Sequence, residues 1–300
     1  MRVLLAVDGS GASDTARELV AAIAWPAGSA LRVLAVVVPP VGLLVESPGP
    51  MYLGPDTLAA IEASRVEEAR RVVGFAQRTL PTDGLTIETV ILHGAAAHEI
   101  VDEAVRVGAD VVVVGSHGRG ALGGLLLGSV SAEVIDHAPC PVLIVRRATL
   151  GRIVLALDGS TAAGQALDIV LHWPIFRALP VVVASVVSLP EEVRGLSAPD
   201  FQDQLDTSMV RLRSGLRAHA EALVAEAVSR LGAVGIPATS RVIEDAPEVG
   251  ILRVAEETEA DLIVVGTRGL TGLTRLRLGS TSRHVLHRAN TSVLVVPPRT

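Results

Sequence analysis

Residues 115–129 read GSHGRGALGGLLLGS, and residues 266–280 read GTRGLTGLTRLRLGS. Both segments fit the spacing Gly-x2-Gly-x9-Gly-Ser, and each directly follows a short apolar run. The second copy lies 151 positions after the first in a chain of 300 residues. A pattern that repeats at half the chain length indicates two copies of one domain. We expect these domains to span residues 1–147 and 151–298.

The composition limits the class of protein. Hydrophobic residues make up 49% of the chain but aromatic residues only 2%, so the cores must consist of Val, Leu, Ile and Ala. No segment reaches the roughly 18 consecutive apolar residues of a membrane helix, and Asp8 follows the first apolar run too soon for a secretory signal. Cys140 is the only cysteine, which excludes an intrachain disulfide and favours a cytoplasmic location. The net charge of −6 argues against general binding of nucleic acid or membrane.

Lysine is absent from the sequence, and all 26 basic residues other than histidine are arginine. A Walker-type phosphate loop needs a lysine that reaches the phosphates, and Schiff-base chemistry needs a lysine amine. Both are therefore excluded. A phosphate bound by this chain must rely on backbone amides, helix termini, hydroxyls, arginine or a metal ion.

Apolar runs of strand length alternate with helical patterns in both halves of the chain. In the first half the runs lie at 2–7, 31–38, 85–92, 110–115 and 141–145. Unbroken runs such as the first are typical of strands covered on both faces in a parallel sheet. Strands alternating with helices predict a doubly wound, Rossmann-like α/β domain, here with a five-stranded parallel sheet flanked by helices. The second half repeats this order.

The second half also contains a long helical pattern near residues 206–231. Its large apolar residues recur at helical spacing, which predicts one apolar face along the helix. These residues are Met209, Leu212, Leu216, Leu223 and Leu231.

Doubly wound sheets bind ligands at the carboxyl ends of their strands, where the winding reverses. The Asp-Gly-Ser turns at 8–10 and 158–160 and the two glycine-rich segments are expected there. Glycine tolerates positive φ and lets backbone amides approach an anion closely. Ser129 and Ser280 stand where the next helix is expected to begin, and helix starts favour negative charge. The alternative is that the glycines only shape a turn and the serines cap the helices.

Charged residues near these segments leave further alternatives open. Asp8 and Asp158 can accept hydrogen bonds from a ribose or base, or share a metal ion with phosphates. The alternative is that each Asp-Gly-Ser turn merely caps the next helix. The second glycine-rich region carries more arginines than the first, which predicts stronger phosphate binding there at low salt, unless these arginines are solvated or contact the other domain. They are Arg268, Arg275, Arg277 and Arg283, against Arg119. Five histidines are interpreted as structural or surface residues, namely His93, His98, His117, His284 and His287.

The repeated glycine spacing, the aspartate after the first strand and the stretch ADVVVVGSHGRGALGGLLLGSVSAEVIDHAPCPVLIV resemble the universal stress protein family. The resemblance covers nearly the whole chain, once per half, and so indicates a tandem member of the ATP-binding branch. One departure lies before the last strand, where residues 138–141 read APCP, as is usual in the family, but residues 289–292 read ANTS.

The resemblance implies a binding site for ATP or AMP, with or without Mg²⁺, in each half; it assigns no metal ligands. The first site would comprise Asp8, Val36, Val114, Gly115, Gly118, Gly128, Ser129, Val130 and Ser131. The second would comprise Asp158, Val186, Val265, Gly266, Gly269, Gly279, Ser280, Thr281 and Ser282. The valines would act through main-chain atoms or by packing against the base.

These observations favour a nucleotide-binding regulator of a stress response with little or no turnover, and no catalytic residue can be named. The alternative is a slow metal-dependent ATPase that uses the same pockets. Adenylyl transfer is disfavoured because neither a Ser-Gly-Gly-x-Asp loop nor a His-x-Gly-His motif is present. A scaffold with empty pockets is disfavoured because both motifs are intact. The expected partners are adenine nucleotide and, within the chain, the other repeat through 141–145 and 292–296; a homodimer is left open.

Overall fold

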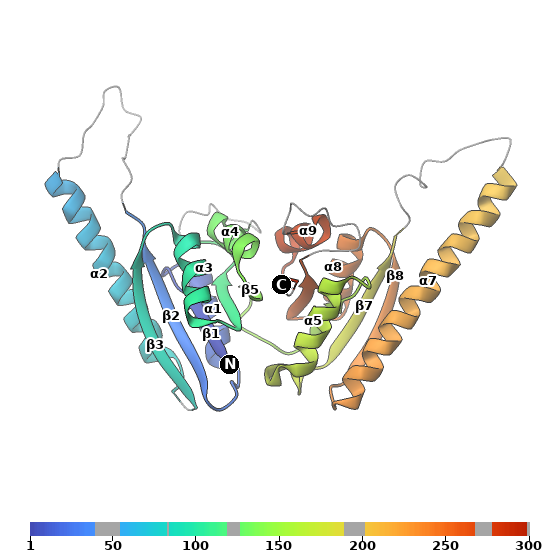
Figure 1. Ribbon diagram of the computed structural model, residues 1–300, viewed down its shortest axis with the longest axis horizontal. Helices are drawn as coiled ribbons and strands as arrows, with labels where there is room; N and C mark the ends of the chain where they lie inside the picture. Colours follow the sequence, from blue (N-terminus) through green and yellow to red (C-terminus); the bar gives the residue numbers. More distant parts are fainter. Residues whose placement is uncertain (40–54, 83, 119–126, 189–201, 268–277, 299–300) are drawn as a thin grey trace, which may run out of the picture. The chain divides into compact units, whose positions relative to one another are not determined.

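The computed structural model describes residues 1–39, 55–82, 84–118, 127–188, 202–267 and 278–298. The chain divides into two compact units, Met1–Ala148 and Thr149–Thr300. Each unit is an α/β domain with helices on both faces of a parallel sheet (Figure 1), so the predicted fold class is confirmed.

The first unit holds five strands and four helices among its described residues. They are β1 (Arg2–Ala6), α1 (Gly11–Ala22), β2 (Ser29–Val37), α2 (Pro55–Thr79), β3 (Leu85–His93), α3 (Ala96–Val107), β4 (Val111–Gly115), α4 (Ser129–His137) and β5 (Val142–Val145). The strands lie in the order β3-β2-β1-β4-β5, and all neighbours are parallel. The winding therefore reverses between β1 and β4.

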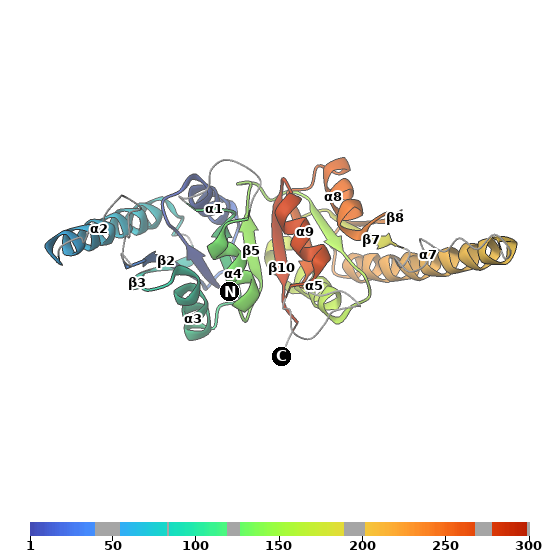
Figure 2. The same cartoon turned by 90° about the horizontal axis from the view of Figure 1, so that it is seen from above.

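The sheet of the first unit is buried because helices cover both of its faces. The helices α1 and α2 pack on one face, and α3 and α4 pack on the other (Figure 2). The unbroken apolar runs of β1 and β4 supply the centre of the core, where Leu4, Leu5 and Val113 are fully buried. Side chains that are apolar on both faces of a strand require this double cover.

The second unit repeats the arrangement. Its elements are β6 (Ile153–Ala156), α5 (Thr161–His172), the short 3-10 helix η1 (Pro174–Phe176), β7 (Val181–Val187), α7 (Gln202–Ala233), β8 (Ala238–Glu244), α8 (Pro247–Glu257), β9 (Leu262–Gly266), α9 (Ser280–Arg288) and β10 (Ser292–Val296). The strand order is β10-β9-β6-β7-β8, again parallel throughout. The winding reverses between β6 and β9.

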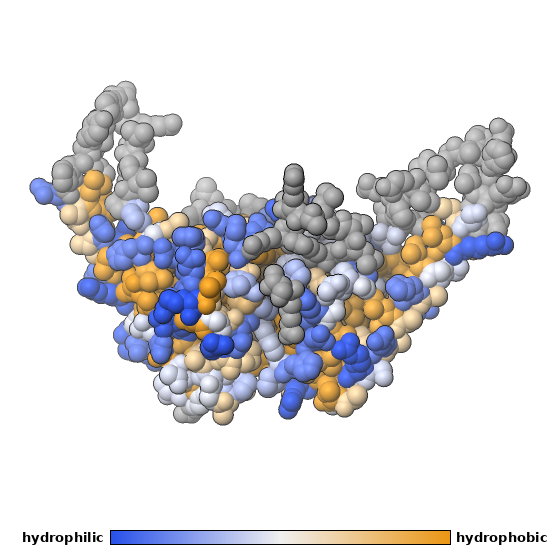
Figure 3. Space-filling model, in the orientation of Figure 1, coloured by the Kyte–Doolittle hydropathy of each residue, from blue (hydrophilic) through white to orange (hydrophobic). Residues whose placement is uncertain are grey.

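Among the described side chains of the long helix α7, the buried ones lie in its C-terminal part. Leu231 is fully buried and Leu223 half-buried, but Leu212 is 39% exposed and Val210 66% exposed. Apolar surface is visible along α7 (Figure 3). Of the five residues predicted for one apolar face, Leu231 is buried, Met209, Leu216 and Leu223 are half-buried, and Leu212 is exposed. None of the helices that the structure describes is long and apolar enough to cross a membrane.

Candidate functional site

The turn after β1 places the Asp8 carboxylate at the carboxyl end of the sheet. Its Oδ1 accepts a hydrogen bond from the Ser10 backbone N–H at 2.9 Å. The Asp-Gly-Ser turn caps α1 through Ser10, whose Oγ accepts from the Ser13 N–H at 3.2 Å, so the predicted capping of the helix by this turn is confirmed. The other carboxylate oxygen, Oδ2, faces the segment after β4: a Cβ atom added to Gly118 would lie 2.8 Å from it. One oxygen of Asp8 thus orders the turn, and the other is directed toward the glycine-rich segment.

The first glycine-rich segment needs glycine for close approach. Gly128 has a φ of −66°, and neither Gly115 nor Gly118 is among the glycines with positive φ. A Cβ atom on Gly115 would lie 2.7 Å from the carbonyl carbon of Ala12, and one on Gly128 would lie 3.0 Å from the Cα of His117. Of the two properties of glycine considered for this segment, positive φ therefore does not apply to these three glycines. Glycine is required at positions 115 and 128 because backbone passes directly against them.

The start of α4 lies at this segment, and no side chain caps it. Its N-cap residue is Gly128, and Ser129 is the first helical residue, so the alternative in which Ser129 caps the helix is wrong. The Ser131 hydroxyl donates to the Gly115 carbonyl oxygen at 2.8 Å and so joins α4 to the end of β4. The first backbone N–H groups of a helix have no partner inside the helix and favour an anion.

A cavity of about 910 Å³ opens between the carboxyl ends of β1, β2 and β4, the helix α2 and the start of α4. All nine predicted residues of the first site line it: Asp8, Val36, Val114, Gly115, Gly118, Gly128, Ser129, Val130 and Ser131. Its volume lies in the range of small-molecule sites, roughly 300–1,000 Å³. The structure thus brings the residues predicted for the first site together around one cavity.

Four polar residues of this cavity were not predicted for the site: Ser13, Arg65, Glu68 and His117. Arg65 and Glu68 of α2 line the cavity, and the Arg65 Nη1 donates to the Val38 carbonyl oxygen at 2.6 Å. His117 was interpreted as a structural or surface residue, but it also lines the cavity. Its Nδ1 lies 3.0 Å from the Ser116 Oγ. The helical spacing of Arg65, Glu68 and Val72 contains a signal, because it places all three on one side of the predicted helix.

The turn after β6 in the second unit repeats the turn after β1. The Asp158 Oδ1 accepts from the Ser160 N–H at 2.9 Å, and the Ser160 Oγ accepts from the Ala163 N–H at 3.2 Å. Gly159 has a φ of 81°, where glycine is favoured. Ser160 is therefore the cap of α5, and Asp158 again orders the turn through one oxygen.

The start of α9 in the second unit also matches that of α4. Gly279 is the N-cap residue, no side chain caps the helix, and Ser280 is the first helical residue. The Ser282 hydroxyl donates to the Gly266 carbonyl oxygen at 2.6 Å. A Cβ atom on Gly266 would lie 2.7 Å from the Ala162 carbonyl carbon. Both units therefore present the same uncapped helix start beside the same close backbone contact.

For several residues predicted for the second site, the structure gives only the burial or one neighbour of the side chain. Val265 is buried in β9, and Thr281 is half-buried in the first turn of α9. Val186 faces α8, since a Cβ atom on Gly250 would lie 2.7 Å from its Cγ2. Gly269 lies outside the described residues, as do the three arginines Arg268, Arg275 and Arg277.

Two further features of the chain bear on its chemistry: the thiol of Cys140, its one cysteine, and the capacity of its side chains to bind a metal ion. Burial and, less strongly, the charge of Asp110 raise the pKa of the Cys140 thiol to about 12, so it is protonated at neutral pH. This fits a small buried apolar residue rather than a redox switch. Within the described ranges no group of three or more His, Cys, Asp or Glu side chains could hold a metal ion.

Fold and cavity define the chain as two doubly wound α/β domains in tandem, with a ligand-sized cavity at the carboxyl end of the first sheet. The model of the universal stress protein family matches residues 1–146 and again residues 149–297. The chain therefore belongs to the universal stress protein family, as a tandem of two such domains.

Relatives of similar length share this organisation. A universal stress protein of Mycolicibacterium smegmatis is 30% identical, over 99% of this chain and 97% of its own length. One of Mycobacterium tuberculosis is 28% identical, over 98% and 96%. The crystal structure of a universal stress protein from Archaeoglobus fulgidus covers 100% of this chain and 98% of its own with a TM-score of 0.64 and 22% identity, which is a likeness of fold.

Proposed function

We propose that each unit binds an adenine nucleotide, ATP or AMP, and that occupancy regulates a stress response with little or no turnover of the nucleotide. The phosphates would lie at the uncapped starts of α4 and α9, and the ribose or base would lie beside Asp8 or Asp158. The proposal joins family membership to the geometry of the first cavity.

One observation carries the proposal: the backbone amides at the start of α4 and the Asp8 Oδ2 that faces Gly118 border the same cavity. A helix start attracts anions, whereas a carboxylate repels them and accepts hydrogen bonds from hydroxyl or amino groups. A ligand that suits both has phosphates at one end and donor groups further along. Nucleotides have this chemistry.

A charge placed at the helix start tests the proposal without damaging the fold. Ser129→Asp and Ser280→Asp each put a carboxylate at the first residue of α4 or α9, where it favours the helix but repels phosphate. Native mass spectrometry with Mg-ATP should find two nucleotides on the natural chain, one on each single variant and none on the double variant. Ser129→Asn and Ser280→Asn, which are nearly the same size but neutral, should keep both nucleotides. No nucleotide on the natural chain at millimolar ATP would overturn the proposal.

The second candidate is slow metal-dependent ATP hydrolysis in the same cavity. It is favoured by the Asp8 Oδ2, which faces the cavity-lining Gly118 and could orient a metal ion or a water. Asp8→Asn keeps the Oδ1 acceptor that orders the turn and removes the charge. If the chain hydrolyses ATP in this way, Mg²⁺-dependent phosphate release should be measurable for the natural chain and should disappear in Asp8→Asn. Equal release by both proteins would exclude a role for Asp8 in hydrolysis.

A further inference from the structure

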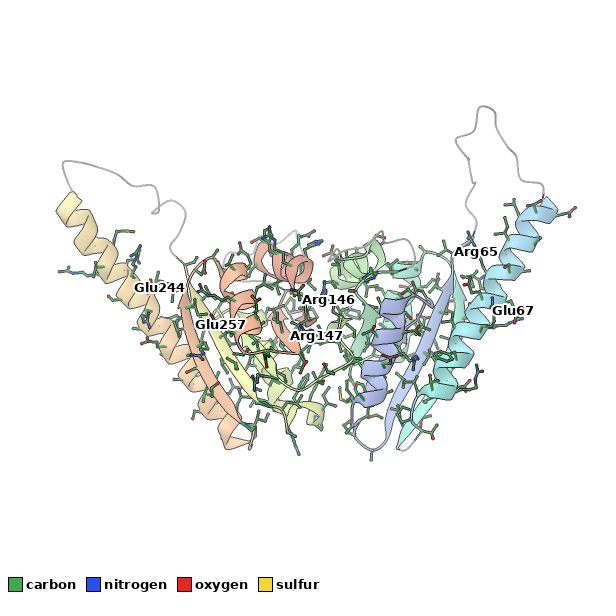
Figure 4. All side chains as sticks on the ribbon, turned by 180° about the vertical axis from the view of Figure 1, so that it is seen from behind. Arg65, Glu67, Arg146, Arg147, Glu244 and Glu257 are labelled. Carbon is green, nitrogen blue, oxygen red and sulfur yellow. The ribbon has the colours of Figure 1, made fainter. Side chains whose placement is uncertain are left out.

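Arg65 connects α2 to the end of β2 at the wall of the first cavity. Its Nη1 donates to the Val38 carbonyl oxygen at 2.6 Å, and its side chain is half-buried. Figure 4 shows Arg65 on the side of α2 toward the sheet, whereas Glu67, two residues later, is 62% exposed. The hydrogen bond holds the guanidinium at the cavity wall.

The strand order fixes which end of a ligand would meet this wall. The start of α4 lies at the end of β4, and the order β4-β1-β2 places Asp8 next and the end of β2 last. Two strand spacings of about 4.8 Å separate β4 from β2. A nucleotide with its phosphates at α4 therefore directs its sugar past Asp8 and its base toward Val36 and α2.

The wall has the chemistry of a site for a flat ring. Val36, Ala69 and Val72 supply apolar surface, and none of the lining residues within the described ranges is Phe, Tyr or Trp. The Arg65 guanidinium is planar, and such groups stack on aromatic faces. We infer that Arg65 is a binding residue whose guanidinium stacks on the base of the nucleotide in the first unit. This inference rests on the proposed function.

The second unit has leucine at the position that corresponds to Arg65. The buried residues of the two long helices correspond at a constant separation of 151: Ala69, Val73, Ala76 and Leu80 in α2, and Ala220, Val224, Ala227 and Leu231 in α7. The same separation pairs Arg65 with Leu216 and Glu68 with His219. His219 lies near the turn after β6, since a Cβ atom on Gly159 would lie 3.7 Å from its Nε2. The base contact of Arg65 is therefore specific to the first site.

The experiment uses the full chain carrying Ser280→Asp, so that only the first site binds. ATP and inorganic tripolyphosphate are titrated separately by calorimetry. Arg65→Leu, which installs the residue of the second unit, should weaken ATP binding about tenfold and leave tripolyphosphate binding unchanged. Arg65→Lys keeps the positive charge but removes the planar guanidinium, so it should lose most of the ATP affinity that Arg65→Leu loses. Arg70→Leu, whose native side chain is 66% exposed on the same helix, is the matched control and should change neither affinity.

Each other result has a definite meaning. Unchanged ATP binding in Arg65→Leu would overturn the base contact and leave nucleotide binding standing. Equal loss of ATP and tripolyphosphate would also overturn it, because Arg65 would then act through charge or through the fold. Thermal unfolding of each variant separates these two causes. If the Ser280→Asp parent and the natural chain bind no ATP, the proposed function fails, and this inference fails with it.

Discussion

Gly115 at the end of β4 lies directly against Ala12 in the first turn of α1: a Cβ atom on Gly115 would lie 2.7 Å from the Ala12 carbonyl carbon. Gly266 and Ala162 stand in the same relationship in the second unit, again with a distance of 2.7 Å. Real Cβ atoms do not approach backbone this closely, so a larger residue must push the helix from the strand. These glycines are therefore explained by helix packing before any ligand is considered.

We expect Gly115→Ala to destabilise the first unit by about 2 kcal/mol, a typical cost of forcing an extra group into a packed site. Trp25 lies in the first unit and Trp173 in the second, and the chain has two tryptophans. In a Trp173→Phe background, Trp25 fluorescence during denaturant unfolding reports the first unit. Gly11→Ala is the control, because nothing lies within 4 Å of a Cβ atom there. An equal effect of both substitutions would contradict the packing argument.

Much of the fold was predictable because it follows from local patterns. The unbroken run of β1 and the alternation with helices are sufficient to predict a doubly wound parallel sheet. The predicted start of a helix near Ser129 is confirmed, but the cap position of Gly128 depends on backbone geometry that no residue pattern specifies. The role of Gly115 depends on contact with Ala12, more than a hundred positions away in the chain, and a motif cannot distinguish such packing from ligand binding.

The parts of the site that could not be predicted depend on contacts between distant elements. Arg65 belongs to α2, and only the packing of α2 beside the end of β2 places it at the cavity. Arg32 interrupts the apolar run of β2, which is a visible signal, but its partner Glu103 is on α3 and cannot be identified from spacing. The position and the partner of such charged residues are determined by tertiary structure.

A buried ion-pair cluster distinguishes the first unit. Glu103 is 2% exposed; it forms an ion pair with Arg32 and accepts a hydrogen bond from the Arg106 Nε at 2.7 Å. At the corresponding β7 and α8 positions of the second unit lie the buried residues Val182 and Val254. We expect Glu103→Val to destabilise the first unit by about 3 kcal/mol, because Arg32 loses its buried partner. The double variant Arg32→Val/Glu103→Val should lie within about 1 kcal/mol of the natural chain.

The same cluster predicts a dependence of stability on pH. Burial alone would raise the pKa of Glu103, but the hydrogen bonds and charges of Arg106 and Arg32 outweigh it, so the pKa lies below its ordinary value of 4.5. A lowered folded-state pKa adds stability above that ordinary value, and this stability is lost as the pH falls through the folded pKa. As the pH falls below 4.5, the unfolding free energy of the natural chain should therefore decrease relative to that of the double variant, as followed by Trp25 fluorescence. A difference that is constant with pH would contradict the ion-pair assignment.

The Cys140 thiol should react slowly in the folded protein. Burial raises its pKa to about 12, and the thiolate is the reactive form. At pH 8 we expect a thiol reagent such as 5,5′-dithiobis(2-nitrobenzoate) to label the native chain at least about 100-fold more slowly than the chain unfolded in urea, where a thiol pKa is near 8.5. Adding nucleotide should not change this rate. Rapid labelling of the native chain would restore the redox-switch alternative.

The two sites should differ in their response to salt. Arg283 is exposed in the first turn of α9, where a cation is unfavourable unless an anion binds beside it. The glycine-rich segment before it adds three arginines, against one in the first unit. With Ser129→Asp only the second site binds, and with Ser280→Asp only the first. Tripolyphosphate should bind more tightly to the second site at about 10 mM salt, and most of this difference should disappear at about 150 mM salt, where charges are screened.

Arg283→Ala separates the helix effect from the loop arginines. Without phosphate, the substitution should stabilise α9 slightly, by about 0.5 kcal/mol, because it removes a cation from the positive end of the helix dipole. With phosphate bound at low salt, it should weaken binding to the second site by several-fold, because the same charge then faces an anion. If an anion binds at the start of α9, Arg283→Ala should therefore increase stability without phosphate and decrease phosphate affinity. If Arg283→Ala changes neither quantity, or if the two single-site variants bind tripolyphosphate equally at low salt, the arginines serve another purpose.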